Sequence, residues 1–289
     1  MAKGFASRFV AGETLDTALD AVRQLNSEGI TATLDLLGES VYNEKEARKG
    51  ARAYIEMLDR IHAARLDANV SLKLTAMGLD ISEDLCVANV QDILERAREH
   101  QSFVRLDMES SEYTQKTLDL FYERLYPSYR GNVGIVLQSY LYRTAVDIEE
   151  ANKAAARVRL CKGAYKEPAA VAFPAKKDVD ESYLTCMRSL LLNGHYPGIA
   201  THDEAIVRET KRFARDNDIG HDQFEFQMLY GVRRDLQQNL VREGYRMRVY
   251  VPFGTQWYPY LMRRLAERPA NVAFIAGNIM KEMMGRSRR

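Results

Sequence analysis

Short runs of apolar and β-branched residues recur along the chain, and most are followed by a turn and a stretch whose apolar residues have helical spacing. Such runs are typical of β-strands. Eight of them occur, over Thr31–Leu37, Asn69–Thr75, Phe103–Met108, Val133–Gln138, Val158–Cys161, Gly198–Thr201, Phe224–Leu229 and Arg246–Pro252. Amphipathic helices are predicted before and between them, over Thr14–Ser27, Glu44–Ala63, Asp84–His100, Ser111–Leu125, Glu181–Asn193, Asp203–Asn217 and Arg234–Arg242.

This alternation of strands and helices predicts the fold class. Eight such units in 289 residues favour a (βα)8 barrel over an open doubly wound sheet. An open sheet of that kind commonly carries a GxGxxG phosphate loop, and the sequence has no such spacing. No segment has the composition of an interdomain linker, so we expect one domain over residues 1–289.

One more helix is expected near the C-terminal end of the chain. Pro259 suits its first position, and Pro269 prevents it from continuing. Helical spacing gathers polar residues on one face, namely Tyr260, Arg263, Arg264 and Glu267. An apolar face, expected to pack, carries Leu261, Met262 and Leu265.

The adjacent guanidinium groups of Arg263 and Arg264 need a negative partner, because at ~6 Å and an effective dielectric constant of ~20 they repel by about 2–3 kcal/mol. Two interpretations are open. Glu267 pairs with them on a solvated face. Alternatively, the pair binds a substrate carboxylate, whose two oxygens match guanidinium geometry, and Tyr260 walls the rest of a small ligand.

Composition narrows the classes of function. With 41 basic and 40 acidic residues, a net charge of +1 and 46% apolar residues, the chain can bury a sizeable core and has no electrostatic footprint for nucleic acid. Its three cysteines, in no CxxC pair, argue against a disulfide framework and fit a reducing cytoplasm. Its five histidines show neither HxH nor HExxH spacing, so no metal site is assigned. No apolar run is long enough to span a bilayer, and residues 1–10 lack a signal peptide's apolar core.

Polar residues lie within or directly after nearly every predicted strand, and (βα)8 barrels carry their chemistry at the carboxyl ends of the strands. The candidates are Glu39, Lys73, Thr75, Asp107, Glu109, Gln138, Arg159, Lys162, Thr201, His202, Asp203, Glu225, Gln227 and Tyr250. Structural ion pairs are the alternative, such as Lys73 with Asp107, or Glu225 with Arg159 or Lys162. The cationic groups outnumber the carboxylates and predict a pocket for anionic ligands: Lys73, Arg159, Lys162, Arg263 and Arg264.

Nine short motifs in barrel order resemble the proline dehydrogenase family. They are Leu36-Leu37-Gly38-Glu39, Ser71-Leu72-Lys73-Leu74-Thr75, Arg105-Leu106-Asp107-Met108-Glu109, Val136-Leu137-Gln138-Ser139-Tyr140, Arg159-Leu160-Cys161-Lys162-Gly163-Ala164-Tyr165, Ala200-Thr201-His202-Asp203, Phe224-Glu225-Phe226-Gln227, Tyr250-Val251-Pro252-Phe253-Gly254 and the YxxRRxxE helix Tyr260–Glu267. The resemblance runs from about Glu28 to Asn271 and is to the short, monofunctional bacterial form. It implies a distorted (βα)8 barrel that binds FAD, with its last barrel helix across the top. The implied reaction is oxidation of L-proline to Δ1-pyrroline-5-carboxylate, with hydride transfer from C5 to flavin N5 and electrons passed to a quinone.

By this resemblance, the family's roles fall on particular positions. Asp107 and Arg159 are the expected catalytic residues: Asp107 would orient Lys73, and Arg159 would stabilise negative charge near flavin N5. The proline carboxylate would be held by Lys73, Arg263 and Arg264, and its ring would be walled by Ala164, Leu229, Tyr250 and Tyr260. FAD would contact Met108, Gln138, Arg159, Lys162, Gly163, Ala164, Thr201 and His202. Glu39 would pair with Arg263 as a gate.

The resemblance also implies partners and a location. We expect a cytoplasmic enzyme with functional coupling to a pyrroline-5-carboxylate dehydrogenase; peripheral contact with the inner face of the cell membrane, through the basic tail Asn278–Arg289, is left open. Lys166 departs from the longer bifunctional members, which tend to carry an aromatic residue there. Two rival functions stay open: a Schiff-base lyase or aldolase using Lys73 or Lys162, and a non-catalytic anion-binding barrel.

Overall fold

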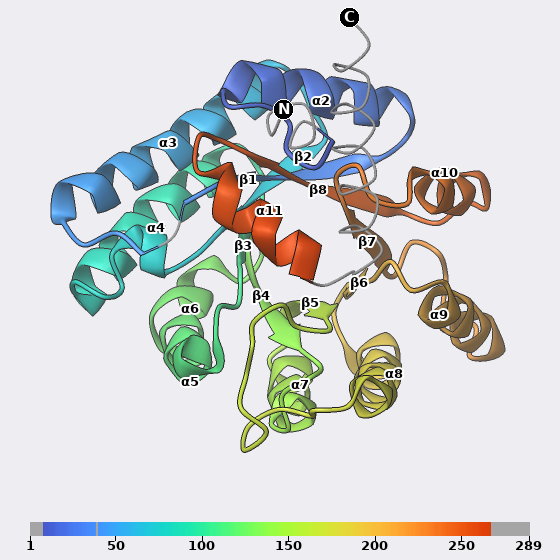
Figure 1. Ribbon diagram of the computed structural model, residues 1–289. Helices are drawn as coiled ribbons and strands as arrows, with labels where there is room; N and C mark the ends of the chain where they lie inside the picture. The colour runs from blue at the N-terminus through green and yellow to red at the C-terminus, as the bar shows by residue number, and fades with distance from the viewer. Residues whose placement is uncertain (1–7, 39, 267–289) are drawn as a thin grey trace, which may run out of the picture.

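Eight parallel strands close into a barrel in sequence order in the computed structural model, which describes residues 8–38 and 40–266 except the side chains of 263–266 (Figure 1). The strands are β1 Thr31–Leu36, β2 Ala68–Leu72, β3 Val104–Leu106, β4 Val133–Gln138, β5 Arg157–Cys161, β6 Gly198–Ala200, β7 Glu225–Leu229 and β8 Met247–Phe253. Each predicted run forms a strand at its expected place. The predicted (βα)8 barrel is therefore confirmed.

Helices surround the barrel, and α11 lies across its face in Figure 1. The helices are α2 Leu15–Ser27, α3 Glu44–Ala63, the 3-10 helix η1 Thr75–Met77, α4 Glu83–Glu99, α5 Ser111–Asp119, the π-helix η2 Leu120–Leu125, α6 Tyr126–Tyr129, α7 Thr144–Lys153, α8 Lys176–Asn193, α9 Glu204–Asp216, α10 Arg234–Arg242 and α11 Trp257–Ala266. Side chains at the starts of several helices accept the first free backbone N–H groups, as Thr14 does for α2 and Asn43 for α3.

Three helices differ from the prediction. The sequence indicated one helix over Ser111–Leu125, but its last six residues form a π-helix that leads into Pro127. Proline lacks an N–H and its ring crowds the preceding turn, so the helix widens there. Helix α7 was missed because Ile148 is the one large apolar side chain among its buried residues. Helix α8 begins at Lys176, earlier than predicted, because its first turn is polar.

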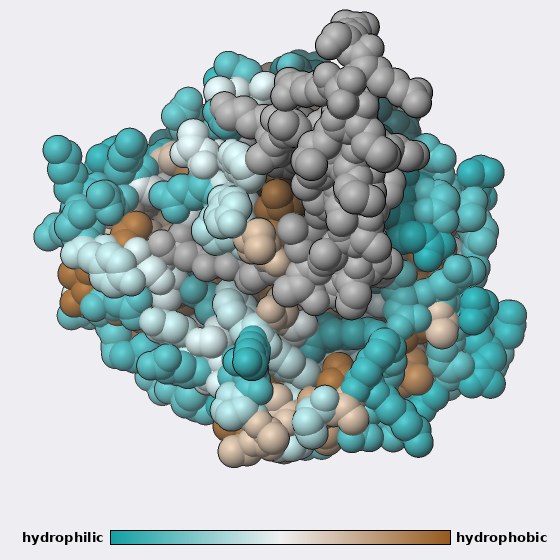
Figure 2. All heavy atoms as spheres, viewed as in Figure 1, coloured by the Kyte–Doolittle hydropathy of each residue, from teal (hydrophilic) through white to brown (hydrophobic). Residues whose placement is uncertain are grey.

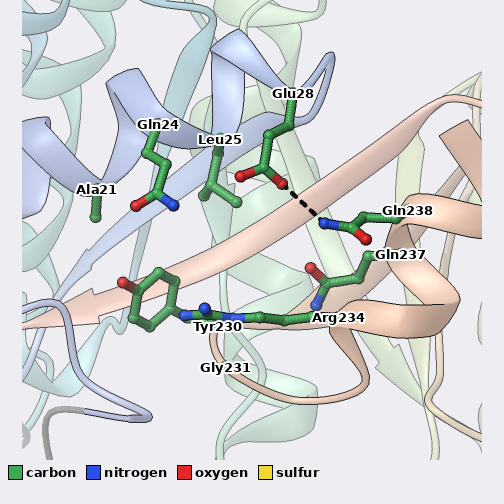
Figure 3. Close-up of a pocket in the computed structure, with 9 residues that line it drawn as sticks. All are labelled: Ala21, Gln24, Leu25, Glu28, Tyr230, Gly231, Arg234, Gln237 and Gln238. Carbon is green, nitrogen blue, oxygen red and sulfur yellow. Dashed lines mark hydrogen bonds between the residues drawn. The ribbon is translucent and has the colours of Figure 1, made fainter.

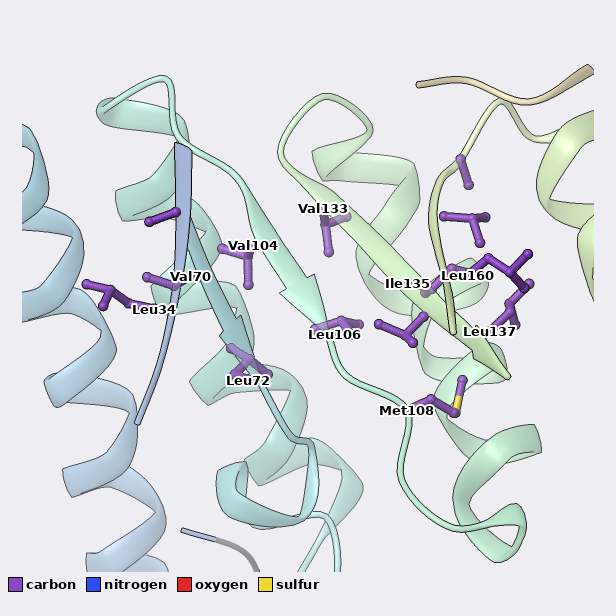
Figure 4. Packing of buried hydrophobic residues seen from close by; sticks show 14 of the residues in the cluster. Leu34, Val70, Leu72, Val104, Leu106, Met108, Val133, Ile135, Leu137 and Leu160 are labelled. Carbon is purple, nitrogen blue, oxygen red and sulfur yellow. The ribbon is translucent and has the colours of Figure 1, made fainter. Parts of the chain in front are cut away.

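The apolar core lies between the barrel and its helices. Outward-facing side chains of the strands fill this layer, including Leu34, Val70, Leu72, Val104, Leu106, Ile135 and Leu160 (Figure 4). Surfaces of the outer helices on the α11 face are largely hydrophilic (Figure 2). This division follows from the period of a strand, whose successive side chains point to opposite faces.

The barrel interior is polar instead. Buried polar side chains recur at every second strand position, among them Thr33, Asp35, Ser71, Arg105, Arg159, Glu225 and Gln227. Two glycines make room for them. A Cβ on Gly134 would lie 2.7 Å from Arg105 Nη1, and one on Gly198 would lie 2.4 Å from Gln227 Nε2. Side chains of neighbouring strands therefore reach across these two positions.

Helix α11 is attached to the carboxyl ends of the strands by a second apolar cluster. Its Tyr260 and Leu261 pack against Phe9, Val10 and Leu37. The prediction that Met262 packs beside Leu261 is wrong, since Met262 is 45% exposed. The helix also begins at Trp257, ahead of Pro259; a proline in the first turn loses no intrahelical hydrogen bond.

The described helices include none with the length and apolar character needed to cross a bilayer. A small pocket of about 60 Å³ lies between α2 and α10, and Tyr230 and Gly231, which follow β7, also line it (Figure 3). Amides line much of it, and Gln238 donates a hydrogen bond to Glu28 across it at 3.4 Å. Its size and polar lining suit a few water molecules.

Candidate active site

Asp107 is the centre of a hydrogen-bonded cluster inside the barrel. It follows β3 and accepts hydrogen bonds from Ser71 Oγ at 2.6 Å, Arg159 Nη1 at 2.7 Å and Tyr250 Oη at 2.7 Å. These three donors come from β2, β5 and β8. A buried ion pair is tolerated when further hydrogen bonds satisfy its remaining groups, as they do here. The cluster therefore fixes the position of the Arg159 guanidinium.

Two further contacts complete the setting of Arg159. Its Nε donates to Gln227 Oε1 at 2.5 Å, and its guanidinium lies over the Tyr250 ring, 5.2 Å from the centroid. Burial raises the pKa of the Tyr250 phenol well above its usual range, and the negative charges of Asp107 and Asp35 act in the same direction. Tyr250 is therefore a neutral hydrogen-bond donor at physiological pH.

Lys73 forms an ion pair with Asp35 on β1, in which Lys73 Nζ lies 3.4 Å from Asp35 Oδ1. Asp35 is 1% exposed and also accepts a hydrogen bond from Tyr54 Oη at 3.4 Å. Burial raises the pKa of the Asp35 carboxyl, and the charge of Lys73 opposes this shift. The expected contact between Lys73 and Asp107 is not among the described hydrogen bonds and ion pairs, so it stays a prediction.

Asp35, Ser71 and Tyr54 were not singled out from the sequence. Asp35 lies within a run that was interpreted as apolar, but it follows Thr31 and Thr33 at period two, a signal for the barrel interior. Two other polar candidates, Thr75 and Glu109, bond to each other. Thr75 Oγ1 donates a hydrogen bond to the Glu109 carboxylate at 2.6 Å.

The suggested pairing of Glu225 with Arg159 or Lys162 is wrong. Glu225 lies at the start of β7 and pairs with Arg248 on β8, with Arg248 Nε 2.8 Å from its Oε1. The same oxygen accepts a hydrogen bond from the Gln227 amide at 2.6 Å. Gln227 thus connects Glu225 to Arg159, and the two charged groups belong to one network without touching.

Several expected flavin contacts lie at the carboxyl ends of β4 and β6. Gln138 ends β4, is 3% exposed, and its Oε1 has no hydrogen-bond partner among the described residues. Thr201 Oγ1 accepts from the backbone N–H of Asp203 at 3.1 Å. His202 Nε2 accepts from the backbone N–H of Leu229 at 2.9 Å, so a neutral His202 ring carries its proton on Nδ1. Met108, by contrast, packs within the apolar core (Figure 4).

Lys162 and Gly163 follow β5. Lys162 Nζ lies 2.5 Å from Asp180 and 3.0 Å from Asp203. Burial acts to raise the pKa of the Asp203 carboxyl, but the hydrogen bond and charge of Lys162, the backbone N–H of Ala205 and the charge of Lys176 together lower that pKa. Gly163 has φ +114°, a conformation that favours glycine, and lies against the Tyr140 ring.

Other predicted residues are only partly placed. Tyr260 is buried on α11, and Ala164 and Leu229 are half-buried after β5 and at the end of β7. Glu39 and the side chains of Arg263 and Arg264 lie outside the described residues. The predicted gate and arginine fork are thus not described. No group of His, Cys, Asp or Glu in the described part of the chain is arranged to hold a metal ion.

Comparison with known proteins gives a consistent family. The family model described as proline dehydrogenase matches residues 18–277. Proline dehydrogenase 2 of Bacillus subtilis strain 168 is 46% identical over 98% of this chain and 94% of its own length. Proline dehydrogenase of Deinococcus radiodurans is 43% identical over 96% of this chain and 90% of its own length.

Solved structures give the same result. Proline utilization A (PutA) from Bdellovibrio bacteriovorus, inactivated by N-propargylglycine, has a TM-score of 0.85 and 29% identity over 91% of this chain. The chain spans 32% of that protein, about a third of its length. The bifunctional PutA of Escherichia coli is 27% identical over 93% of this chain and 24% of its own length. The chain therefore belongs to the proline dehydrogenase family of oxidoreductases.

Proposed function

We propose that this protein oxidises L-proline to Δ1-pyrroline-5-carboxylate, with FAD bound at the carboxyl ends of the barrel strands and a quinone as electron acceptor. The observation that carries the proposal is the setting of Arg159. Arg159 is 7% exposed, and its guanidinium is held by Asp107, Gln227 and the Tyr250 ring. A cation fixed in this way stabilises negative charge without having to reorganise.

The residues present fit a flavin. Gln138 Oε1 is a buried acceptor without a hydrogen-bond partner in the described part of the chain, which a donor group of a bound cofactor would satisfy. Arg159 and Lys162 supply positive charge for an anionic cofactor. The residues that would hold FAD are Gln138, Arg159, Lys162, Gly163, Ala164, Thr201 and His202. Met108, whose side chain packs in the apolar core, stays a proposed contact on the family resemblance alone. When bound, FAD supplies the acceptor for the hydride from proline C5.

The substrate carboxylate is assigned to Lys73 together with Arg263 and Arg264. Lys73 is held by its ion pair with Asp35, so its ammonium group is already oriented before a ligand binds. The pyrrolidine ring would pack among Ala164, Leu229, Tyr250 and Tyr260. Such packing favours a small apolar ring. Glu39 with Arg263 is retained as the proposed gate.

Asp35→Asn is expected to weaken recognition of the substrate carboxylate. The variant keeps the shape of the side chain but removes the charge that positions Lys73. We expect KM for L-proline to rise roughly 10-fold, about 1.4 kcal/mol, with a smaller change in kcat. Steady-state kinetics with L-proline and with pyrrolidine, which lacks the carboxylate, measure this effect.

Tyr54→Phe is the matched control, because it removes a hydrogen bond to Asp35 and leaves the ion pair with Lys73 intact. KM for L-proline should then change by less than about 3-fold. An equal loss of activity on L-proline and on pyrrolidine in Asp35→Asn would show that Asp35 supports the fold and not the carboxylate contact.

An absorption spectrum of the purified protein, recorded before and after adding L-proline without oxygen, tests the proposed reaction. We expect flavin bands that bleach on addition of proline. A yellow protein that proline does not bleach would contradict the substrate and leave the cofactor. A colourless protein that FAD cannot reconstitute would contradict both.

A Schiff-base lyase is the second candidate. It is based on the lysines that lie near the carboxyl ends of the barrel strands. Lysine nucleophiles are activated by apolar surroundings or by a neighbouring cation. Here Lys73 faces Asp35, and Lys162 faces Asp180 and Asp203. These carboxylates do not favour the lyase. Borohydride trapping of a substrate on either lysine would favour the lyase over proline oxidation.

The acceptor and the cellular setting are part of the same proposal. A cytoplasmic enzyme that reduces a quinone must approach a membrane, and the basic tail Asn278–Arg289, outside the described residues, would provide a peripheral contact. The relatives named PutA are bifunctional or much longer than this chain. We propose that the product of the present enzyme passes to a pyrroline-5-carboxylate dehydrogenase.

A further inference from the structure

The amino ends of the strands, at the opposite end of the barrel from the candidate active site, carry a stack of alternating arginine and aromatic side chains. The guanidinium of Arg105 lies 4.8 Å from the ring centroid of Phe103, and that of Arg157 lies 5.3 Å from the same ring. Arg157 also lies 5.1 Å from the ring of Tyr196, whose other guanidinium neighbour is Arg246 at 5.4 Å. We call these five residues the arginine ladder.

The positive charge of the arginine ladder exceeds the negative charge of the carboxylates near it. Glu225 is the buried carboxylate beside it, and its described hydrogen bonds come from Arg248, Gln227 and Tyr196. Two further carboxylates are exposed: Asp222, whose charge acts on Arg246, and Asp67, whose charge acts on Arg248. Aromatic rings attract cations but do not neutralise them. The arginines of the ladder are thus left with uncompensated charge.

The uncompensated charge is clearest at Arg105. It is 5% exposed, and its described hydrogen bonds go to two neutral acceptors, Ile135 O at 3.1 Å and Arg157 O at 2.6 Å. Burial lowers the pKa of this guanidinium well below its usual value, and the charges of Arg159, Arg248 and Arg157 add to that effect while Glu225 opposes it. A buried arginine normally has a carboxylate partner. The described residues offer Arg105 none within ion-pair distance.

Arg157 has the geometry of a ligand-binding group. Aromatic rings lie near its guanidinium, and no hydrogen bond or ion pair is described for its N–H groups within residues 8–266. Guanidinium N–H groups lie in one plane, so stacking leaves the edge available to an acceptor. Tyr196, between Arg157 and Arg246, has φ 49°, a strained conformation for an aromatic residue that its surroundings must enforce.

We propose that the arginine ladder is a binding site for a small oxyanion of the phosphate class, either free phosphate or the phosphate group of a metabolite. A tetrahedral oxyanion can accept hydrogen bonds from the open guanidinium edge of Arg157 and supply the missing negative charge. Binding there would brace the amino ends of β3, β5, β6 and β8. This site is independent of the proposed proline oxidation, because it lies at the other end of the barrel.

Thermal unfolding of the flavin-loaded protein in sodium phosphate, against sodium chloride of equal ionic strength, tests this proposal. At phosphate concentrations about 10 times its Kd we expect Tm to rise by roughly 2–5 °C with a saturating dependence. Arg157→Gln should abolish the rise, and Arg246→Gln, at the exposed end of the ladder, should reduce it. Arg215→Gln is the matched control, since Arg215 is exposed and its described ion pair is with Asp216 alone.

Glycerol 3-phosphate distinguishes the two sources of the ligand. A rise in Tm with inorganic phosphate alone identifies the free ion, and a larger rise with the ester identifies a phosphorylated metabolite. The proposal is overturned if neither compound raises Tm above the chloride control. It is equally overturned if Arg157→Gln and Arg246→Gln both keep the full rise, because the anion would then bind elsewhere.

Discussion

Replacing Asp107 by alanine is expected to lower kcat/KM for L-proline by about 10²–10³-fold. Three donors from β2, β5 and β8 converge on this carboxylate: Ser71, Arg159 and Tyr250. Without it, the Arg159 guanidinium loses its ion pair inside the barrel, and both Arg159 and Tyr250 can leave the positions assigned to them beside the flavin and the substrate ring. An uncompensated buried charge also costs about 3–5 kcal/mol of stability.

The activity and stability effects of this variant are separable. Steady-state kinetics should be normalised to bound flavin, and the free energy of unfolding measured in urea. Asp107→Asn keeps an acceptor oxygen and should retain more stability than alanine, but it should lose activity because the charge opposite Arg159 is gone. Asp92→Ala, on the exposed side of α4, controls for loss of an aspartate. A kcat/KM within about 3-fold of wild type for Asp107→Ala would refute the assigned role.

Gly163→Ala is expected to destabilise the protein by about 3 kcal/mol or more and to release flavin. Gly163 has φ +114°, and a Cβ there would lie 2.5 Å from carbons of the Tyr140 ring. Tyr140 is 8% exposed and its hydroxyl donates to Glu167 at 3.3 Å, so its ring cannot turn aside freely. Displacing residue 163 would also shift Lys162 and Ala164, two proposed flavin contacts.

Gly131→Ala is the matched control for this substitution, because an added Cβ there meets no atom within 4 Å. The midpoint of urea unfolding and the ratio of flavin to protein absorbance measure the two effects. We expect Gly131→Ala to change neither by much. If Gly163→Ala were as stable as Gly131→Ala and kept its flavin, the close contact with Tyr140 would have no importance for the fold or the cofactor.

The strands of this barrel were predictable because each is a short apolar run bounded by turns. Long helices such as α3, which has the predicted bounds Glu44–Ala63, were predictable from the spacing of their apolar residues. The π-helix and α7 were not, since one depends on the local effect of Pro127 and the other buries few large side chains. Local patterns thus determined the elements, and the deviations arise where a single residue or the tertiary contacts dominate.

The partners within the site were much less predictable than its members. Period-two polar residues indicated Lys73, Asp107 and Arg159, but which of them pair depends on how strands meet across a closed barrel. Asp107 and Tyr250 are 143 residues apart in sequence and 2.7 Å apart in space. Asp35 was missed because one carboxylate in an apolar run carries little signal until the run is known to face a polar interior.

The pairing of β1 with β8 determines when the barrel can be completed during protein synthesis. Six residue pairs join these strands, from Thr31↔Arg248 to Leu36↔Phe253. A ribosome releases β8 only after the other seven strands have emerged. Until then the edge of β1 stays unpaired, and the last strand formed, finally β7, is the other unpaired edge. Contacts between such distant segments form slowly. This seam is therefore where a nascent chain is exposed longest to pairing with its neighbours on the same messenger.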